Sequence, residues 1–284
     1  MGETFAHLIC PICGTLLTKE GASLYCRGAR RHCYDISAAG YVNLLPPGKK
    51  NNARAGDDKE MLRCRSRFLS GGWYDPISET AARLGGEATD KDPKKFFVDA
   101  GCGEGYHTCN IARNLPDGSA SCFGIGIDAA KSGAAAGAKL ARAAGIDGVQ
   151  FIAGNIFAMP LEDQCADLVY SIFAPIPGVE AARILKPGGA LIVACAGREH
   201  LWELRCQLYG RPRVGEGVQM PAGFAVAHKE TLSYAIHLPH QDAIRCLFAM
   251  TPFYYRCPSE GRQRLLACES LTVKVEVDFT VLTL

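Results

Sequence analysis

Short apolar runs and stretches with helical periodicity alternate along the chain from about residue 76. The runs that predict strands cover residues 96–100, 122–128, 150–153, 166–172 and 190–195. The stretches that predict helices between them include residues 129–144 and 179–185. Such alternation is typical of a mostly parallel sheet covered by helices on both faces. The pattern therefore predicts a doubly wound α/β domain.

The segments before and after this alternation have other patterns. Residues 9–35 hold two cysteine-bearing turns around a strand-like stretch at 22–25, which is the layout of a zinc ribbon. Residues 38–56 are turn-rich, and residues 57–70 have helical composition and periodicity. We therefore expect a zinc-binding module at 1–37, a linker and helix at 38–75, and the main domain at 76–284.

The end of the main domain shows three further segments with regular patterns. Residues 231–236, 242–250 and 271–282 follow a loop that begins at Gly210. They predict one helix and two strands that close the sheet.

Composition limits the class of protein. The chain has 284 residues, of which 48% are hydrophobic and 21% charged. No apolar run approaches the roughly 20 residues that span a bilayer, so we expect no membrane segment and a cytoplasmic location. Most of the 14 cysteines lie singly in apolar segments, as Cys165, Cys195 and Cys246 do, which fits reduced core residues. The sequence leaves the oligomeric state open, with a homodimer as one alternative.

A glycine-rich motif follows the first predicted strand. In VDAGCGEGYHT, residues 98–108, Asp99 precedes Gly101, Gly103 and Gly105, where the strand gives way to a helix. Glycines let the chain turn sharply and bring backbone amides close to a bound nucleoside. Asp128 ends the next predicted strand, where a carboxylate can accept hydrogen bonds from both hydroxyls of a ribose. These residues predict a nucleoside cofactor with an unphosphorylated ribose.

The spacing Gly-x-Gly-x-Gly resembles class I S-adenosylmethionine-dependent methyltransferases, which have a Rossmann-like fold. The stretch LKPGGALIVA, residues 185–194, is similar to the turn and fifth strand of that class. By this resemblance Asn155 and Ile156, which follow the third strand, line the adenine of S-adenosylmethionine, although many relatives have aspartate at the first position.

The N-terminal cysteines have the spacing of a metal site. Cys10 and Cys13 form a Cys-x2-Cys knuckle, and Cys26 follows after twelve intervening residues. Such soft ligands bind zinc in a closed tetrahedral site, and the bound ion would stabilise a module too small to bury much apolar surface. The adjacent His32 and Cys33 both qualify as the fourth ligand, and spacing alone leaves the choice open.

The N-terminal quarter is also the basic part of the chain. Residues 1–75 hold 11 lysines and arginines against 7 acidic residues. The excess is small, and an ordinary solvated face explains it as well as a contact with a polyanion does.

The order of motifs along the whole chain resembles the RlmA family of 23S ribosomal RNA guanine-N1 methyltransferases. The resemblance rests on ICPICG, RHCYDISAAGYVNLLP, GDDKEM, RFLSGGWYDP, VDAGCGEGYHT, IFAP, LKPGG, GREHLWEL and MTPFYYR. It implies one structural zinc held by three cysteines and His32. This chain has five residues between Cys26 and His32 where three are usual, so Cys33 stays an alternative.

The same resemblance implies that Tyr74 and His200 flank the methyl donor together with Gly103 and Glu104. His200 is the best titratable candidate for accepting the proton of guanine N1, because SIFAP after the fourth strand offers no acid or amine. Phe173, Tyr74 or Trp73 is expected to provide a flat surface for the target base.

The resemblance also implies a hairpin of 23S rRNA as the partner. Family members methylate neighbouring guanines of one hairpin, so the sequence does not decide which guanine this chain modifies. The zinc module and a basic group are expected to contact RNA phosphates; that group comprises Lys49, Lys50, Arg54, Arg63, Arg65 and Arg67. Two alternatives remain, a methyltransferase for a small metabolite and a zinc-ribbon RNA-binding factor that binds S-adenosylmethionine without turnover.

Overall fold

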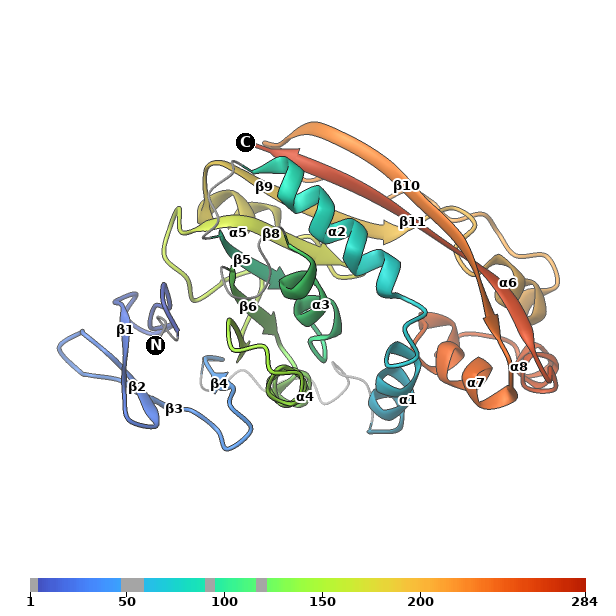
Figure 1. The fold of residues 1–284 in the computed structure, drawn as a ribbon, viewed down its shortest axis with the longest axis horizontal. Helices are drawn as coiled ribbons and strands as arrows, with labels where there is room; N and C mark the ends of the chain where they lie inside the picture. The colour runs from blue at the N-terminus through green and yellow to red at the C-terminus, as the bar shows by residue number, and fades with distance from the viewer. Residues whose placement is uncertain (1–4, 47–58, 90–94, 116–121) are drawn as a thin grey trace.

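The structure is a computed structural model that describes residues 5–46, 59–89, 95–115 and 122–284 (Figure 1). Within these ranges the strands form a three-stranded sheet and an eight-stranded sheet. The small sheet consists of β1 (Leu17–Glu20), β2 (Ser23–Cys26) and β3 (Cys33–Asp35). The large sheet consists of β4 (Val42–Asn43), β5 (Lys95–Ala100), β6 (Cys122–Asp128), β7 (Val149–Ala153), β8 (Ala166–Ile172), β9 (Leu185–Ala196), β10 (Ala225–Leu238) and β11 (Leu271–Thr283).

Helices connect these strands along the chain. They are α1 (Lys59–Leu69), α2 (Asp75–Ala88), α3 (Tyr106–Asn114), α4 (Lys131–Ala143), α5 (Gly178–Ile184), α6 (Trp202–Tyr209), α7 (Gln241–Ala249) and α8 (Ser259–Leu266). A short 3-10 turn, Pro252–Tyr255, follows α7. No helix in the described ranges is both long and apolar enough to cross a membrane.

The large sheet has the order β10-β11-β9-β8-β5-β6-β7-β4. The strands from β4 to β9 pair in parallel, and β11 pairs antiparallel with both β9 and β10. The chain steps outward from β5 to β7 and then returns to β8 beside β5, so the strand order reverses there. Ligands of doubly wound sheets bind at this switch point, outside the carboxyl ends of the strands. The predicted Rossmann-like fold is confirmed.

The side chains of the central strands alternate between two separate buried apolar layers, one on each face of the sheet. Phe97 and Tyr170 belong to the layer beneath α2, α3 and α4, whereas Phe96 and Val98 belong to the opposite layer with α5. Both layers are buried because successive strand residues point to opposite faces and each face of the sheet is covered. Figure 1 shows α2 and α3 lying along one face of the sheet.

The N-terminal module helps to cover the second face. Leu8 is fully buried in the same apolar layer as Val98, and it forms a β-bridge with Leu161. His7 Nδ1 lies 3.0 Å from a carboxylate oxygen of Glu162 in the same loop of the main domain. The segment before β1 therefore anchors the N-terminal module to the main domain, and Leu17 and Leu24 of the small sheet belong to the same apolar cluster.

The segment after the small sheet differs from the sequence expectation. Residues 38–56 were expected to be irregular, yet β4 lies within them and pairs in parallel with the edge strand β7. Val42 and Leu44 are buried there. A strand of two residues is too short to give a recognisable sequence pattern, so β4 is identified only by its pairing with β7.

Candidate active site and metal centre

The glycine loop of VDAGCGEGYHT lies at the carboxyl end of β5. Gly101, Gly103 and Gly105 have φ angles of +86°, +55° and +79°, a region that side chains rarely adopt. A Cβ at Gly105 would lie 2.6 Å from the ring of Phe151, so the loop packs directly on β7. At Gly103 a Cβ would meet nothing closer than Arg65 at 3.9 Å, so this glycine opens onto free space.

Asp128 joins the end of β6 to this loop. One carboxylate oxygen accepts the N–H of Gly103 at 2.9 Å, and the other accepts the N–H of Ala130 at 2.7 Å. The side chain is partly exposed, and each oxygen keeps a further lone pair for an outside donor. The carboxylate thus fixes the loop and remains accessible beside it.

Asp99 was expected to contact the cofactor, but its side chain is buried beneath the glycine loop. It is 2% exposed, and it accepts a hydrogen bond from the hydroxyl of Thr108 at the start of α3. Burial raises the pKa of Asp99 to about 7, and the charge of Asp128 contributes a smaller increase. The hydrogen bond from Thr108 acts in the opposite direction and lowers the pKa. Asp99 therefore ties β5 to α3 beneath the loop and does not line the cavity described next.

A cavity of about 300 Å³ opens beside the glycine loop. It is lined by five of the residues expected at the cofactor, namely Tyr74, Gly101, Gly103, Glu104 and His200. The remaining expected residues lie outside its lining: Asp99, Gly105, Asp128, Asn155 and Ile156. Asp128 is the last residue of β6 and Asn155 follows the end of β7, so they lie along the same edge of the sheet beyond the cavity.

Asn155 lies in a tight turn after β7. Its side-chain oxygen accepts the N–H of Phe157 at 3.0 Å, and Ile156 is partly buried against the second apolar layer. The amide NH2 group of Asn155 is thus the part of the side chain that can meet an outside acceptor.

Aromatic rings make up one wall of the cavity. Phe173 is 41% exposed, and its ring centroid lies 5.5 Å from that of His200 and 6.2 Å from that of Tyr74. Its φ angle of +51° is unusual for a bulky residue, and such backbone strain is concentrated at functional sites. Trp73, the third expected aromatic surface, instead packs on Phe68 at 4.8 Å and lies outside the cavity lining. Of the three alternatives Trp73 is therefore not supported, because its partly buried ring packs on Phe68.

His200 is held by the edge of β11. Its Nδ1 lies 2.9 Å from the carbonyl oxygen of Glu276, and its Nε2 lies 3.5 Å from the hydroxyl of Tyr74. Burial lowers the pKa of His200 to about 4, so the imidazole is neutral near pH 7. Burial also raises the pKa of Tyr74, so its hydroxyl stays protonated.

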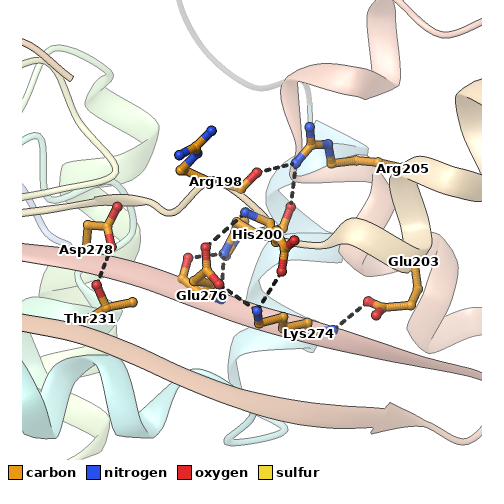
Figure 2. Close-up of polar contacts among 9 residues, drawn as sticks. Arg198, His200, Glu203, Arg205, Thr231, Lys274, Glu276 and Asp278 are labelled. Carbon is orange, nitrogen blue, oxygen red and sulfur yellow. Dashed lines mark hydrogen bonds and ion pairs between the residues drawn. The ribbon is translucent and has the colours of Figure 1, made fainter. Parts of the chain in front are cut away.

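Charged side chains surround the backbone that carries His200 (Figure 2). Lys274 Nζ lies 2.7 Å from the Glu276 carboxylate and 2.9 Å from that of Glu199. Arg205 donates to the carbonyl oxygens of Arg198 and His200 at 3.1 and 3.3 Å. This network fixes the loop after β9 and thereby the orientation of the imidazole.

Some residues of the cavity were not expected from the sequence as cofactor or base contacts. They are Arg65, Cys102, Tyr106, His107, and Met250, Thr251, Pro252 and Phe253 after α7. Arg65 was expected at RNA phosphates, but it lies beside Gly103. The motifs VDAGCGEGYHT and MTPFYYR contain most of these positions. Nothing in either motif shows which side chains face a ligand, because that depends on contacts between distant segments.

The expected zinc ligands meet at one point of the small sheet. The ligand atoms of Cys10, Cys13, Cys26 and His32 all lie within 4.8 Å of one another. His32 Nδ1 is 3.4 Å from the sulfur atoms of both Cys10 and Cys26. Ligands bound to zinc at about 2.0–2.3 Å in a tetrahedron lie roughly 3.5 Å apart, so the group fits a structural zinc ion.

Cys33 is excluded from this group by its place on β3. Its side chain is exposed, and its sulfur lies 3.9 Å from a carboxylate oxygen of Asp35. The preceding residue, His32, turns toward Cys26 and donates its backbone N–H to that sulfur. Tyr34 places its hydroxyl 3.0 Å from the sulfur of Cys10, as an outer hydrogen bond to a metal ligand does.

Comparison with known proteins agrees with both parts of the chain. Residues 91–211 match the family described as a methyltransferase domain, and residues 8–53 match the family described as RlmA, N-terminal. The 23S rRNA (guanine(748)-N(1))-methyltransferase of Streptomyces fradiae is 28% identical over 97% of this chain and 96% of its own length. YxjB of Bacillus subtilis strain 168, provisionally named a 23S rRNA (guanine-N(1)-)-methyltransferase, is 30% identical over 98% of this chain and 97% of its own length. This chain therefore belongs to the RlmA family of 23S rRNA (guanine-N1)-methyltransferases.

Proposed function

We propose that the protein transfers the methyl group of S-adenosylmethionine to N1 of a guanine in a hairpin of 23S rRNA. The observation that carries the proposal is the cavity beside the glycine loop, in which an exposed aromatic ring, Phe173, adjoins a neutral imidazole, His200. A flat apolar wall with a nearby proton acceptor suits a nucleobase that carries a proton at the reacting nitrogen. The relatives described above are named for this reaction.

The residues that would hold S-adenosylmethionine follow the carboxyl ends of β5, β6 and β7. Gly101, Gly103 and Glu104 line the cavity, and the free space above Gly103 is where a cofactor can approach the backbone. Asp128 would accept the ribose hydroxyls, and Asn155 with Ile156 would border the adenine. When bound, the cofactor supplies a methyl group that its positive sulfur makes electrophilic.

The target base would stack on Phe173 at the mouth of the cavity. A base inside a helix cannot reach this site, so it must leave its stack and find a replacement surface. Base–aromatic stacking contributes about 1–3 kcal/mol, which offsets part of that cost. Tyr74 and His200 then border the base, and most of the rate enhancement comes from holding N1 in line with the methyl group.

His200 would accept the proton that guanine N1 loses. The 2.9 Å contact to the Glu276 carbonyl is favourable when Nδ1 carries the hydrogen, which leaves a lone pair on Nε2. With a pKa of about 4 the imidazole is a weak base. A weak base suffices here, because the proton becomes strongly acidic as the new carbon–nitrogen bond forms.

RNA phosphates would bind along a basic groove of about 670 Å³ between α1 and α7. Arg63, Arg67 and Arg245 line it, and Arg67 and Arg245 share one carboxylate, that of Asp242, at 2.5 and 2.9 Å. The groove thus carries net positive charge. Lys49, Lys50 and Arg54 lie outside the described residues, and the zinc module at 1–37 stays our expectation for a further RNA contact.

Two finer expectations belong to the same proposal. A protein that modifies ribosomal RNA acts in the cytoplasm. A homodimer is consistent with the outer edge of β10, which pairs with no other strand in the described part of the chain and could pair with a second copy. Light scattering on the purified protein tests the dimer, and a mass of one chain would contradict it.

The experiment is methylation of a 23S rRNA transcript by the purified protein with radiolabelled S-adenosylmethionine. A methyl group on N1 blocks Watson–Crick pairing, so reverse transcription should stop at one guanine, and mass mapping should place the methyl group there. Phe173→Leu should lower kcat/KM about 5- to 150-fold, whereas Phe173→Tyr, which keeps the ring, should lower it far less. Unmodified RNA with turnover of a small acceptor would support the metabolite enzyme instead. Cofactor binding without any turnover would support the RNA-binding factor.

A further inference from the structure

A second imidazole, His107, faces the same cavity as His200. It is the second residue of α3, and its ring centroid lies 6.5 Å from that of Phe173. Phe173 in turn lies 5.5 Å from His200. A base stacked on Phe173 is therefore close to two histidines, of which the mechanism above uses one.

The hydrogen bond of Ser78 determines which nitrogen of His107 carries the proton. Ser78 is fully buried on α2, and its hydroxyl lies 2.8 Å from Nδ1 of His107, which is its only partner in the described structure. A buried hydroxyl hydrogen without an acceptor is costly, so the hydroxyl donates to Nδ1. A neutral imidazole has one hydrogen, which must then be on Nε2. Burial lowers the pKa of His107 to about 4, so the ring is neutral near pH 7.

His200 has the opposite arrangement. Its Nδ1 lies 2.9 Å from the carbonyl oxygen of Glu276 and 3.3 Å from the amide nitrogen of the same residue, and the shorter contact decides in favour of a hydrogen on Nδ1. The hydroxyl of Tyr74, whose only partner in the described structure is Nε2 of His200, points to the same assignment because it needs an acceptor there. At 3.5 Å this contact is weak enough to be exchanged for a base N–H.

Nε2 of His107 is accessible from the cavity. In the described residues, the buried side-chain nitrogen and oxygen atoms without a hydrogen-bond partner are Gln150 Oε1 and Tyr170 OH. Nε2 of His107 makes no hydrogen bond to any described residue and is not one of these two atoms, so it is not buried. One cavity therefore presents an N–H donor from His107 and a lone-pair acceptor from His200.

We propose that His107 is a specificity-determining residue, whose Nε2–H donates to O6 of the target guanine while His200 accepts from N1–H. This inference rests on the function proposed above and adds how the base is selected. Guanine presents an acceptor at O6 beside a donor at N1, which complements the two imidazoles. Adenine and cytosine present an amine beside an unprotonated nitrogen, so both contacts would become repulsive, and such mismatches are strongly rejected.

The test compares variants of His107 on a hairpin that contains the mapped guanine. His107→Leu should lower kcat/KM about 10- to 100-fold, because the donor is lost, while the Kd for S-adenosylmethionine measured by calorimetry stays within about twofold. His107→Gln, which keeps an N–H donor, should recover most of the activity. His237→Leu, which changes an exposed histidine of β10, is the matched control and should behave as the wild type.

A second arm changes the substrate instead of the protein. Replacing the guanine by 6-thioguanine weakens the acceptor, so the wild type should lose activity and His107→Leu should lose little more. Three results would each overturn the assignment. In the first, the losses of activity caused by 6-thioguanine and by His107→Leu are independent of each other. In the second, kcat/KM is unchanged in His107→Leu, and in the third, that variant loses only affinity for S-adenosylmethionine. If the leucine variant does not fold, unchanged activity of the wild type on 6-thioguanine would still overturn the contact to O6. A wild type that leaves guanine N1 unmethylated would instead refute the proposed function.

Discussion

Asp128→Ala should weaken S-adenosylmethionine binding and destabilise the fold at the same time. The carboxylate accepts the N–H of Gly103 at 2.9 Å and that of Ala130 at 2.7 Å, and it is expected to accept the ribose hydroxyls as well. Losing charged hydrogen bonds or leaving a partner unsatisfied costs about 1–3 kcal/mol. The site is partly open to water, so we expect a loss of about 1–3 kcal/mol in the free energy of unfolding and a 5- to 150-fold rise in Kd.

Urea denaturation and calorimetric titration with S-adenosylmethionine measure the two effects separately. Asp128→Asn keeps one acceptor oxygen, so both losses should be smaller than in Asp128→Ala. Asp147→Ala, which removes an exposed carboxylate in the loop between α4 and β7, is the control and should leave both quantities unchanged. A folded Asp128→Ala protein with wild-type affinity would refute the assignment of the ribose contact to this residue.

Three further predictions follow from the metal site, the glycine loop and the buried imidazoles. His32→Ala should lose the bound zinc while Cys33→Ala retains one ion per chain by metal analysis; the reverse result would move the fourth ligand to the exposed thiol. Gly105→Ala should lower the free energy of unfolding by about 1–3 kcal/mol more than Gly145→Ala does, as measured by urea titration. Both glycines have positive φ, but only a Cβ at Gly105 would lie 2.6 Å from an aromatic ring of β7. Equal losses of unfolding free energy in the two variants would show that the glycine loop can shift to accommodate the Cβ. For His107, a pKa lowered from 6.5 to about 4 means that the unfolded chain binds the extra proton between these values, so stability is complete above pH 6.5 and falls as the pH drops toward 4. In His107→Gln this pH dependence should be smaller than in the wild type by up to about 1.4 kcal/mol per pH unit, and identical slopes would contradict the neutral imidazole.

The sequence by itself predicts the features that depend on neighbouring residues. The glycine loop and the acid at the end of the next strand are recognisable because a sharp turn needs glycines at set positions. The alternation of apolar runs and helical stretches likewise predicts the doubly wound sheet, since each element shows its own period. Cys10, Cys13 and Cys26 are identified by spacing for the same reason.

The choice between His32 and Cys33 needs the tertiary structure. The two residues are adjacent in the chain, and the geometry at the start of β3 directs one toward the metal ligands and the other to solvent. Spacing along the chain cannot distinguish neighbours, because side-chain direction depends on how β3 pairs with β2.

The covering of the sheet and the shape of the cavity also depend on contacts between distant segments. Leu8 completes an apolar layer with strands that begin almost ninety residues later, which no local pattern shows. Tyr74, His107, Phe173 and His200 come from four separate segments and meet at the carboxyl ends of β5, β8 and β9. The protonation of each histidine is decided by a hydrogen-bond partner that is distant from it in sequence, Ser78 for His107 and Glu276 for His200. Sequence can name such residues, but only packing sets the direction of their hydrogen bonds, because a neutral imidazole takes the tautomer that its fixed neighbour requires.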